Sequence, residues 1–441
     1  MTIDQITERA RRTMGIASLN EMQQAVAAAV SRDIILIAPT GSGKTLAFAI
    51  EILKRLGDAP AGKTSAVIVA PSRELVIQIY NVVRAMALPL KTTAVYGGRP
   101  MTAEKGSLSP APDILVATPG RLIDHLDNGN VDLSSVTFAV IDEYDKSLEL
   151  GFREQMSRIV GVMRDRRREC GLMLTSATRL ADVPDFVDLS RAQVIDMSDT
   201  TDPRGRTMVM NVPSPARDKL DTLVGLLRTL GTGPVMVFVN HRESAERVVN
   251  HLNKQKIDAV LYHGGLEQRD REIAVSRLAS GTSPVMVATD LGGRGLDIDG
   301  VRAVVHYHMP VNEQTWTHRN GRTARVDNAG EVYVITGPDE NVPGYVTTDH
   351  DFYPDMTLTA PVRTGKVMLY VSAGKRDKIS RGDLAGFVMK VAAVPADAVG
   401  TITVTPDYSL IAIDRRYARD VVDTAGKSKV KNKKVKVSIL D

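Results

Sequence analysis

The chain has 441 residues, of which 43% are hydrophobic and 24% charged, and this size predicts two or three globular domains. No apolar run is long enough to cross a bilayer and the N-terminus lacks the apolar stretch of a secretory signal, so we expect a cytoplasmic protein with no membrane partner. The lone Cys170 excludes an internal disulfide and a cysteine-based metal site.

Early in the chain, a strand, a glycine-rich loop and a helix follow one another. The strand is predicted over residues 34–37 and the helix over residues 46–56, and Lys44 and Thr45 end the loop. Glycines let backbone N–H groups curl around a phosphate, Lys44 can reach the outer phosphates of ATP, and the Thr45 hydroxyl can ligate Mg²⁺. The loop residues expected at the nucleotide are Thr40, Gly41, Ser42 and Gly43. The alternative is a glycine-rich turn that merely precedes Lys-Thr.

Two carboxylates, Asp142 and Glu143, follow the apolar run 138–141. Ligands of open α/β sheets gather at the carboxyl ends of strands. We therefore expect Asp142 to hold the metal, mainly through water, and Glu143 to orient or deprotonate the attacking water. An Asp-Glu pair by itself commonly lies in a solvated loop. In a chain that also has a phosphate-binding loop, the pair indicates ATP hydrolysis.

A cationic segment far along the chain, residues 318–325, contains Arg322 and Arg325. Charge builds up on the γ-phosphate during transfer, and guanidinium groups stabilise it most when they arrive from a second domain as a cleft closes. We therefore expect both arginines to be catalytic. A basic surface helix is the alternative that spacing alone leaves open.

Apolar strands alternate with helical patterns through most of the chain. Strands are expected at 34–37, 66–70, 114–117, 138–141 and 172–175, and again at 235–239, 259–262, 285–288, 303–306 and 331–335. This alternation predicts an α/β chain with two tandem doubly wound parallel-sheet lobes, over residues 1–203 and 204–338. The second lobe has no glycine loop after its first strand, so lobe one alone is expected to hold the nucleotide.

The end of the chain differs in composition. Residues 339–361 gather Pro, Gly, Asp and Thr and are predicted to form a linker with packed aromatics at Phe352 and Tyr353. From Pro361 onward there are sixteen Lys or Arg against eight Asp and no Glu, so this segment carries +8 and the remainder about −4. The positive excess lies where a polyanionic partner would bind.

The third unit, residues 362–441, has a pattern of its own. Strands at 367–371, 401–405, 409–413 and 435–439, with helices at 381–389 and 416–424, give the βαββαβ order of an α+β RNA recognition motif. Tyr370 and Tyr408 are candidates for stacking on bases, with core or edge packing as the alternative. For the lysine run 427–436, a frayed solvated tail is the alternative to a surface that follows phosphates.

Together these motifs resemble those of the DEAD-box RNA helicases over nearly the whole chain. Gln23 resembles the glutamine of the adenine-reading Q motif, and further matches in the first half are residues 71–75, 97–98, 118–121 and 176–178. The resemblance implies two RecA-like lobes that use ATP and Mg²⁺ to separate RNA strands locally. The family residues that contact the RNA backbone correspond to Arg73, Gly98, Thr118 and Arg121.

The remaining family motifs follow in order at residues 237–242, 263–271 and 288–297. By this resemblance Arg242 and Thr289 contact RNA, and Asp297 meets the ribose of ATP. Two departures stand out. Tyr144 replaces the alanine of D-E-A-D, and we expect its phenol either to face solvent or to displace the 176–178 turn. The aromatic that usually precedes the Q-motif glutamine is absent, so adenine recognition would depend on the glutamine alone.

The third unit resembles the C-terminal domain of the DbpA subgroup of bacterial DEAD-box helicases, although Leu410 stands where relatives carry an aromatic. The resemblance implies binding to a hairpin of 23S ribosomal RNA in pre-50S particles. The residues expected to contact this RNA are Tyr370, Lys375, Arg376, Lys431, Lys433 and Lys434.

These observations predict a monomeric ATP-dependent RNA helicase that acts on 23S ribosomal RNA during assembly of the large subunit. A non-unwinding RNA-binding anchor or an ATP-gated RNA clamp is the alternative that Tyr144 and the missing aromatic leave open. A DNA helicase is disfavoured by the motif set and by the basic third unit.

Overall fold

The computed structural model describes residues 1–39, 41–98, 100–164, 170–179, 186–198, 207–290, 301–323 and 330–440. The described residues form two compact bodies, one up to Ser198 and one from Thr207 onward. The second body contains both lobe two and the third unit. Among the helices in these ranges, none has the length and apolar character that crossing a bilayer requires.

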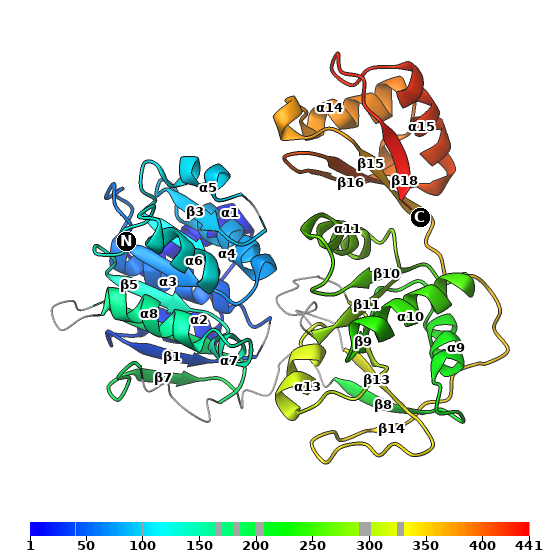
Figure 1. The fold of residues 1–441 in the computed structure, drawn as a ribbon, viewed down its shortest axis with the longest axis horizontal. Coiled ribbons are helices and arrows are strands. Elements are labelled where there is room, and N and C mark those ends of the chain that lie inside the picture. Colours follow the sequence, from blue (N-terminus) through cyan, green and yellow to red (C-terminus); the bar gives the residue numbers. More distant parts are fainter. Residues whose placement is uncertain are drawn as a thin grey trace. The chain divides into compact units, whose positions relative to one another are not determined.

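The first unit is built on a sheet of seven parallel strands in the order β3-β4-β2-β5-β6-β1-β7, with helices on both faces (Figure 1). Its strands are β1 (Ile34–Ile37), β2 (Ala66–Val69), β3 (Thr92–Val95), β4 (Ile114–Ala117), β5 (Phe138–Ile141), β6 (Gly171–Ser176) and β7 (Gln193–Asp196). Its helices are α1 (Ile3–Met14), α2 (Glu21–Ala28), α3 (Lys44–Leu56), α4 (Arg73–Met86), α5 (Met101–Leu108), α6 (Pro119–Asp127), α7 (Tyr144–Glu149) and α8 (Arg153–Met163).

Continuous apolar strands form this sheet because both of its faces are covered. Alternate residues of a strand point to opposite faces, so Ile34 and Leu36 of β1 pack in the core with α1 to α4. Ile35 and Ile37 of the same strand pack in the second core, with α6, α7 and α8. The strands of parallel sheets that are buried on both faces have unbroken hydrophobic sequences, without the alternation of apolar and polar residues seen in half-exposed strands.

A second parallel sheet organises the next lobe, in the order β10-β11-β9-β12-β13-β8-β14. Its strands are β8 (Met208–Pro213), β9 (Val235–Val239), β10 (Ala259–Tyr262), β11 (Val285–Thr289), β12 (Ala303–His306), β13 (Glu331–Thr336) and β14 (His350–Asp351). The helices described here are α9 (Leu220–Leu230), α10 (Arg242–Lys254), α11 (Gln268–Ala279) and α13 (Glu313–Asn320). The predicted fold class, two doubly wound parallel-sheet lobes, is confirmed.

All ten strands expected in the two lobes are present, with ends within one residue of the prediction. Four strands were not predicted from the sequence: β3, β7, β8 and β14. Three of these lie at sheet edges and β8 lies next to one, so each has partly exposed positions that interrupt the apolar run. An edge strand needs only one buried face and carries a weaker hydrophobic signal.

The predicted linker, residues 339–361, is held along lobe two rather than free of it. His350 and Asp351 form β14 against β8, and the Asn211 side chain donates to Asp351 Oδ1 at 2.7 Å. Phe352 packs edge-on against Tyr333 with ring centroids 5.2 Å apart, as its predicted packing requires. Tyr353, predicted to pack as well, is instead 72% exposed.

The third unit is a four-stranded antiparallel sheet in the order β16-β17-β15-β18, with helices on one face (Figure 1). Its elements are β15 (Lys366–Val371), α14 (Arg381–Gly386) continued by a π-helical turn (Phe387–Val391), β16 (Val399–Val404), β17 (Ser409–Asp414), α15 (Ala418–Lys427) and β18 (Val437–Leu440). This confirms the βαββαβ order. The helix predicted over 381–389 changes to π geometry midway.

The sheet face away from α14 and α15 packs on α11 of lobe two. Met368, Tyr408 and Leu410 form a small apolar cluster there, and Ile273 of α11 packs against it. The Tyr408 hydroxyl donates to Glu272 Oε2 at 2.9 Å, and burial, together with the Glu272 carboxylate, raises the pKa of Tyr408. The third unit is therefore docked on lobe two through the sheet face that carries Tyr370 and Tyr408.

We predict that Ile273→Asp loosens this docking, because a carboxylate within the apolar cluster is costly to desolvate. Amide hydrogen exchange of residues 368–371 and 408–411 should rise by at least about tenfold, the ratio for each 1.4 kcal/mol of lost protection. The control is Val311→Asp, a site 76% exposed on lobe two. Equal exchange in both variants would contradict the docking.

Candidate active site and nucleic-acid interface

Apart from Gln23 on α2, the predicted motifs of the first unit lie just past the carboxyl ends of strands. Since the strands are parallel, these ends share one edge of the sheet. Taken across the sheet, the residues that follow β3, β4, β2, β5, β6 and β1 at this edge are Gly98, Thr118, Arg73, Asp142, Thr178 and Gly43. The edge therefore has two halves, with the residues expected at RNA beside β3, β4 and β2 and those expected at ATP beside β5 and β1, on either side of the 176–178 turn that follows β6.

The glycine loop between β1 and α3 has the backbone geometry that a phosphate cradle needs. Gly43 has φ +91°, and a Cβ there would lie 2.6 Å from Gln23 Nε2, so only glycine fits. The Asn20 side chain donates to Ser42 O at 2.9 Å. The Lys44 ammonium donates to Ala38 O at 2.6 Å and to Pro39 O at 3.0 Å, inside its own loop.

Gln23 lies against this loop from the start of α2. Its Oε1 accepts from the Asn20 backbone N–H at 3.0 Å, in a capping box, and its Nε2 donates to Gly43 O at 3.4 Å. The predicted adenine-reading residue is thus tied directly to the predicted phosphate loop. Ile6, which stands near the position of the missing aromatic, is fully buried in the core beneath α1.

Asp142 and Glu143 stand where β5 ends, and both are buried. Thr175 of β6 donates from its hydroxyl to Asp142 Oδ1 and accepts from the Glu143 backbone N–H at 3.2 Å. Burial and the neighbouring Glu143 carboxylate raise the pKa of Asp142 to about 6, against the opposing effects of Thr175 and Lys44. Burial likewise lowers the pKa of Lys44, and Asp142 opposes that shift.

This set of groups fits a nucleoside triphosphate with Mg²⁺. An anion would stabilise the Lys44 ammonium that burial disfavours, and a cation would stabilise the Asp142 carboxylate beside it. Lys44 and the loop N–H groups would hold phosphates, and Thr45, in the first turn of α3, would hold the metal together with Asp142.

Glu143 is oriented by a second buried group. Lys146, which is fully buried on α7, donates to Glu143 Oε1 at 2.7 Å. Glu143 itself has φ +48°, a conformation rare for a side chain larger than glycine. Sequence reasoning missed Lys146 because a lysine three residues after a carboxylate is usually part of a solvated helix face.

Tyr144 corrects one expectation. It is fully buried and packs in the core beneath β5, where it neither faces solvent nor displaces the Ser176-to-Thr178 turn. That turn is intact, because Ser176 Oγ donates to Thr178 O at 2.7 Å and Thr178 Oγ1 donates to Asp145 Oδ2 at 3.4 Å. The first residue of α7 points into the sheet, and there the core has room for a phenol ring.

On the other half of the edge, the structure brings Arg73 and Gly98 together. The Arg73 guanidinium lies across the loop after β3, and Gly98 has φ +90°, so that a Cβ there would collide with Arg73. Arg121, on α6, lies 3.5 Å from Glu104 Oε2, and Glu104 also bonds the His125 ring at 2.9 Å. Thr118 occupies the N-cap position of the same helix, and its side chain makes no capping hydrogen bond there.

We predict that Gly98→Ala weakens RNA binding by displacing Arg73. A charge-assisted hydrogen bond is worth about 1.5–3 kcal/mol, so affinity should fall about 10- to 100-fold. Gly129→Ala is the control, since Gly129 has φ +62° but an added Cβ would meet nothing within 4 Å. Fluorescence anisotropy with single-stranded RNA measures both, and an equal, small loss in the two variants would contradict the role of the Arg73 contact.

In lobe two, Arg242 begins α10 and lies beside the loop after β10, where a Cβ on Gly265 would be 3.2 Å from Arg242 Nη1. Thr289 ends β11 and is buried. Both predicted RNA contacts therefore lie at the carboxyl ends of adjacent strands, as in lobe one. Arg322 is buried just past α13, and its N–H donates to Arg319 O at 3.2 Å.

Arg319 lies next to the predicted catalytic arginines in sequence, and sequence reasoning missed its role. Its buried guanidinium pairs with Asp290 at 2.6 and 2.8 Å and donates to Asn240 Oδ1 at 2.8 Å and to His308 O at 2.7 Å. It thereby ties the loops after β9, β11 and β12 to the predicted arginine helix. Trp316 of the same helix stacks on His306 with ring centroids 4.5 Å apart.

Three predicted site residues, Thr40, Asp297 and Arg325, lie outside the described residues. Their roles stay predictions.

In the third unit the lysine run is not a frayed tail. Val430 and Lys433 form a bridge with Lys431 and Asn432 at positive φ, which is a tight hairpin turn. Lys431 pairs with Asp383 at 3.1 Å, and Lys433 pairs with Asp377 of the neighbouring turn. That neighbouring turn also carries Lys375 and Arg376, so these residues form one exposed basic surface with Lys434, which we call the lysine-turn surface.

Tyr370 lies apart from this surface. It stacks with Tyr408 on the docking face at a centroid distance of 5.5 Å, and the Arg269 guanidinium of α11 lies 5.2 Å above its ring. Leu410 is buried in the same face. In this arrangement the two tyrosines pack against lobe two, the alternative that the sequence left open.

Comparisons with known proteins agree with this layout. Residues 20–186 match the DEAD/DEAH box helicase family, residues 218–327 the helicase conserved C-terminal domain and residues 368–439 the DbpA RNA binding domain. The ATP-dependent RNA helicase DbpA of Escherichia coli (strain K12) is 30% identical over 440 residues, which cover 97% of this chain and 95% of that protein. The protein of the same name from Bacillus subtilis (strain 168) is 27% identical over 98% of this chain and 96% of its own.

Solved structures support the fold. Mss116p bound to single-stranded RNA and AMP-PNP matches with a TM-score of 0.68 at 21% identity, over 97% of this chain and 90% of that chain. Dbp5 of S. cerevisiae bound to RNA and ADP BeF3 matches with a TM-score of 0.65 at 23% identity, over 77% of this chain and 90% of its own.

Fold and site thus define a P-loop ATPase with two RecA-like lobes and an appended RNA-binding domain. The chain belongs to the DEAD-box family of ATP-dependent RNA helicases, in the DbpA subgroup.

Proposed function

We propose that this helicase acts on 23S ribosomal RNA during assembly of the large ribosomal subunit, as a cytoplasmic monomer that uses ATP with Mg²⁺. The observation that carries the target is the lysine-turn surface, which belongs to the DbpA-type domain and is fixed by ion pairs to Asp377 and Asp383. A rigid basic surface loses less side-chain entropy on binding phosphates than a free tail does. The other proposed sites, for ATP and for the RNA backbone, lie on the two lobes.

Each group at the predicted ATP site has a proposed role. Gln23 reads the adenine, Asp297 meets the ribose, and Lys44 with the 40–43 loop binds the phosphates. Thr45 and Asp142 hold Mg²⁺, mainly through water, and the metal supplies neutralisation of the charge between the outer phosphates. Lys146 supports the role of Glu143, since it donates to Glu143 Oε1 at 2.7 Å and so holds the carboxylate in one orientation.

Arg322 and Arg325 complete the proposed chemistry by stabilising charge on the γ-phosphate. RNA is proposed to lie on the half of each edge that carries Arg73, Gly98, Thr118, Arg121, Arg242 and Thr289. Phosphate contacts of this kind position an RNA strand without reading its sequence. Selection of a particular RNA is therefore assigned to the third unit, through Lys375, Arg376, Lys431, Lys433 and Lys434.

The direct test of the catalytic assignment is Glu143→Gln. A general base typically contributes about 10²- to 10⁴-fold, so RNA-stimulated turnover should fall by that factor while ATP and RNA affinities stay within about threefold. Glu149→Gln, an exposed carboxylate on the same helix α7, is the control and should keep wild-type turnover. An RNA-binding anchor would show no RNA-stimulated turnover even in the wild type.

The test of the target is removal of the third unit. Val362 is buried in the core of lobe two, so the truncation should begin at residue 365. We expect the truncated chain to hydrolyse ATP with generic RNA but to lose any preference for a 23S ribosomal RNA fragment. In the full chain, Lys375→Ala with Lys434→Ala should reduce that preference, and Lys366→Ala with Lys390→Ala, a matched exposed pair, should not. An unchanged preference after truncation would contradict the assignment.

A further inference from the structure

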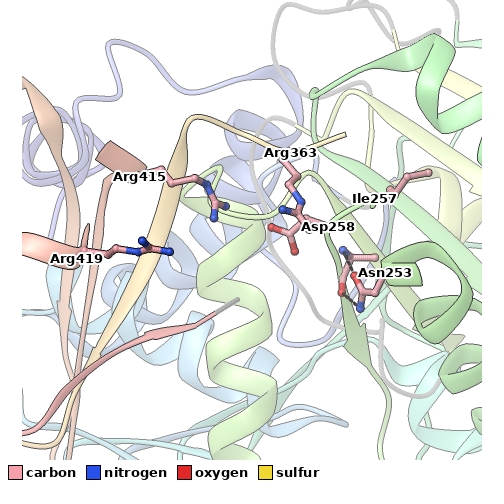
Figure 2. A pocket seen from close by; sticks show the side chains of 7 residues that line it. Asn253, Ile257, Asp258, Arg363, Arg415 and Arg419 are labelled. Carbon is pink, nitrogen blue, oxygen red and sulfur yellow. Dashed lines mark hydrogen bonds between the residues drawn. The ribbon is translucent and has the colours of Figure 1, made fainter. Parts of the chain in front are cut away.

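A cavity of about 530 Å³ lies between lobe two and the third unit (Figure 2). Both of these parts belong to the compact body that begins at Thr207. Lobe two contributes Asn253 and Asp258, the connecting segment contributes Arg363, and the third unit contributes Arg415 and Arg419. Figure 2 shows the three arginine side chains extending toward the same space. We call this cavity the arginine cleft.

Backbone hydrogen bonds tie its walls together. The Val362 N–H donates to Lys256 O at 3.1 Å, and the Asp258 N–H donates to Val362 O at 3.0 Å. On the other side, the Arg415 N–H donates to Gly365 O at 2.8 Å. Arg363 stands between these two attachments, so the positions of both walls are fixed by backbone geometry.

The cleft carries an excess of positive charge. Its one carboxylate, Asp258, already pairs with Arg277 at 3.0 Å. Within the described ranges no carboxylate pairs with the guanidinium groups of Arg363 or Arg419. A guanidinium group presents a planar fork of N–H donors that matches the oxygens of a phosphate, so an anion of this kind would offset the excess charge.

The form of the anion follows from the lining. None of the lining residues that the structure describes is aromatic, so the cleft offers no stacking platform for a base. Asn253, the uncharged amide, is already bonded to the Ala259 N–H at 3.1 Å. A site of arginines without a base-reading surface suits a sugar-phosphate backbone.

We propose that the arginine cleft binds the phosphodiester backbone of RNA where the strand passes from the third unit to lobe two. This inference rests on the proposed RNA target, since it places one strand on both RNA-binding parts of the chain. Docking of the third unit on α11 holds the cleft together, so the same contact that buries the tyrosines creates this site.

The test uses the full-length chain with Arg363→Ala and Arg419→Ala together. The probe is a fluorescent 23S ribosomal RNA hairpin with a single-stranded extension, and anisotropy is measured over a range of salt concentrations. Each lost phosphate contact should reduce the salt slope by about one, so we expect a slope lower by about two and affinity lower by about tenfold or more. ATPase activity without RNA should be unchanged.

The matched control is Arg416→Ala with Arg381→Ala. Arg416 lies on the same turn as Arg415 but pairs with Asp414 at 2.7 Å and does not line the cleft. If the double cleft variant unfolds at a lower temperature than the control, Arg419→Gln alone serves, and its slope should fall by about one.

The inference is wrong if the cleft variant binds RNA with the affinity and salt slope of the wild type. It is also wrong if the variant loses binding to poly-glutamate while its RNA binding is unchanged, because the cleft would then bind an acidic peptide. A wild-type chain that binds 23S and generic RNA equally would instead contradict the proposed target. In that case the change of slope measured with generic RNA still decides the role of the cleft.

Discussion

Parallel strand pairing is the constraint on which the rest of this structure depends. It brings the carboxyl ends of all strands of a sheet to one edge, so residues far apart in sequence, such as Lys44 and Asp142, share a single environment. In lobe one, that edge is divided by the strand order, with β5, β6 and β1 beside the predicted nucleotide and β3, β4 and β2 beside the predicted RNA. The turn from Ser176 to Thr178 lies on the nucleotide half and bonds Asp145.

The buried charges at these edges are satisfied by specific partners. In lobe one, Lys146 holds Glu143, and Thr175 holds both Asp142 and the backbone of Glu143. In lobe two, Arg319 holds three strand-end loops through Asp290, Asn240 and His308. Removing one partner of such a pair leaves a buried charge unpaired, which typically costs about 3–5 kcal/mol. These residues therefore stabilise the loops on which the proposed ligand contacts depend.

The third unit uses its sheet and its turns differently. The sheet face with Tyr370 and Tyr408 packs on α11, and the basic residues lie on the turn around Lys431 and on the neighbouring 375–376 turn. The connecting segment is held along lobe two by β14 and by the Val362 pairing. Lobe two and the third unit are consequently one unit in this chain, and a ligand bound to both would contact a surface that neither has alone.

The sequence by itself determined the two-lobed α/β architecture and the βαββαβ third unit, because buried strands and glycine loops leave local patterns that do not depend on distant residues. It also placed several motifs at strand ends, as found for Gly43, Asp142 and Thr289. Only the tertiary structure decided that Tyr144 enters the core, that Lys146 and Arg319 are buried partners, and that Tyr408 docks on Glu272. Burial and pairing are set by what packs across the sheet or between domains, and a linear pattern carries no record of those neighbours.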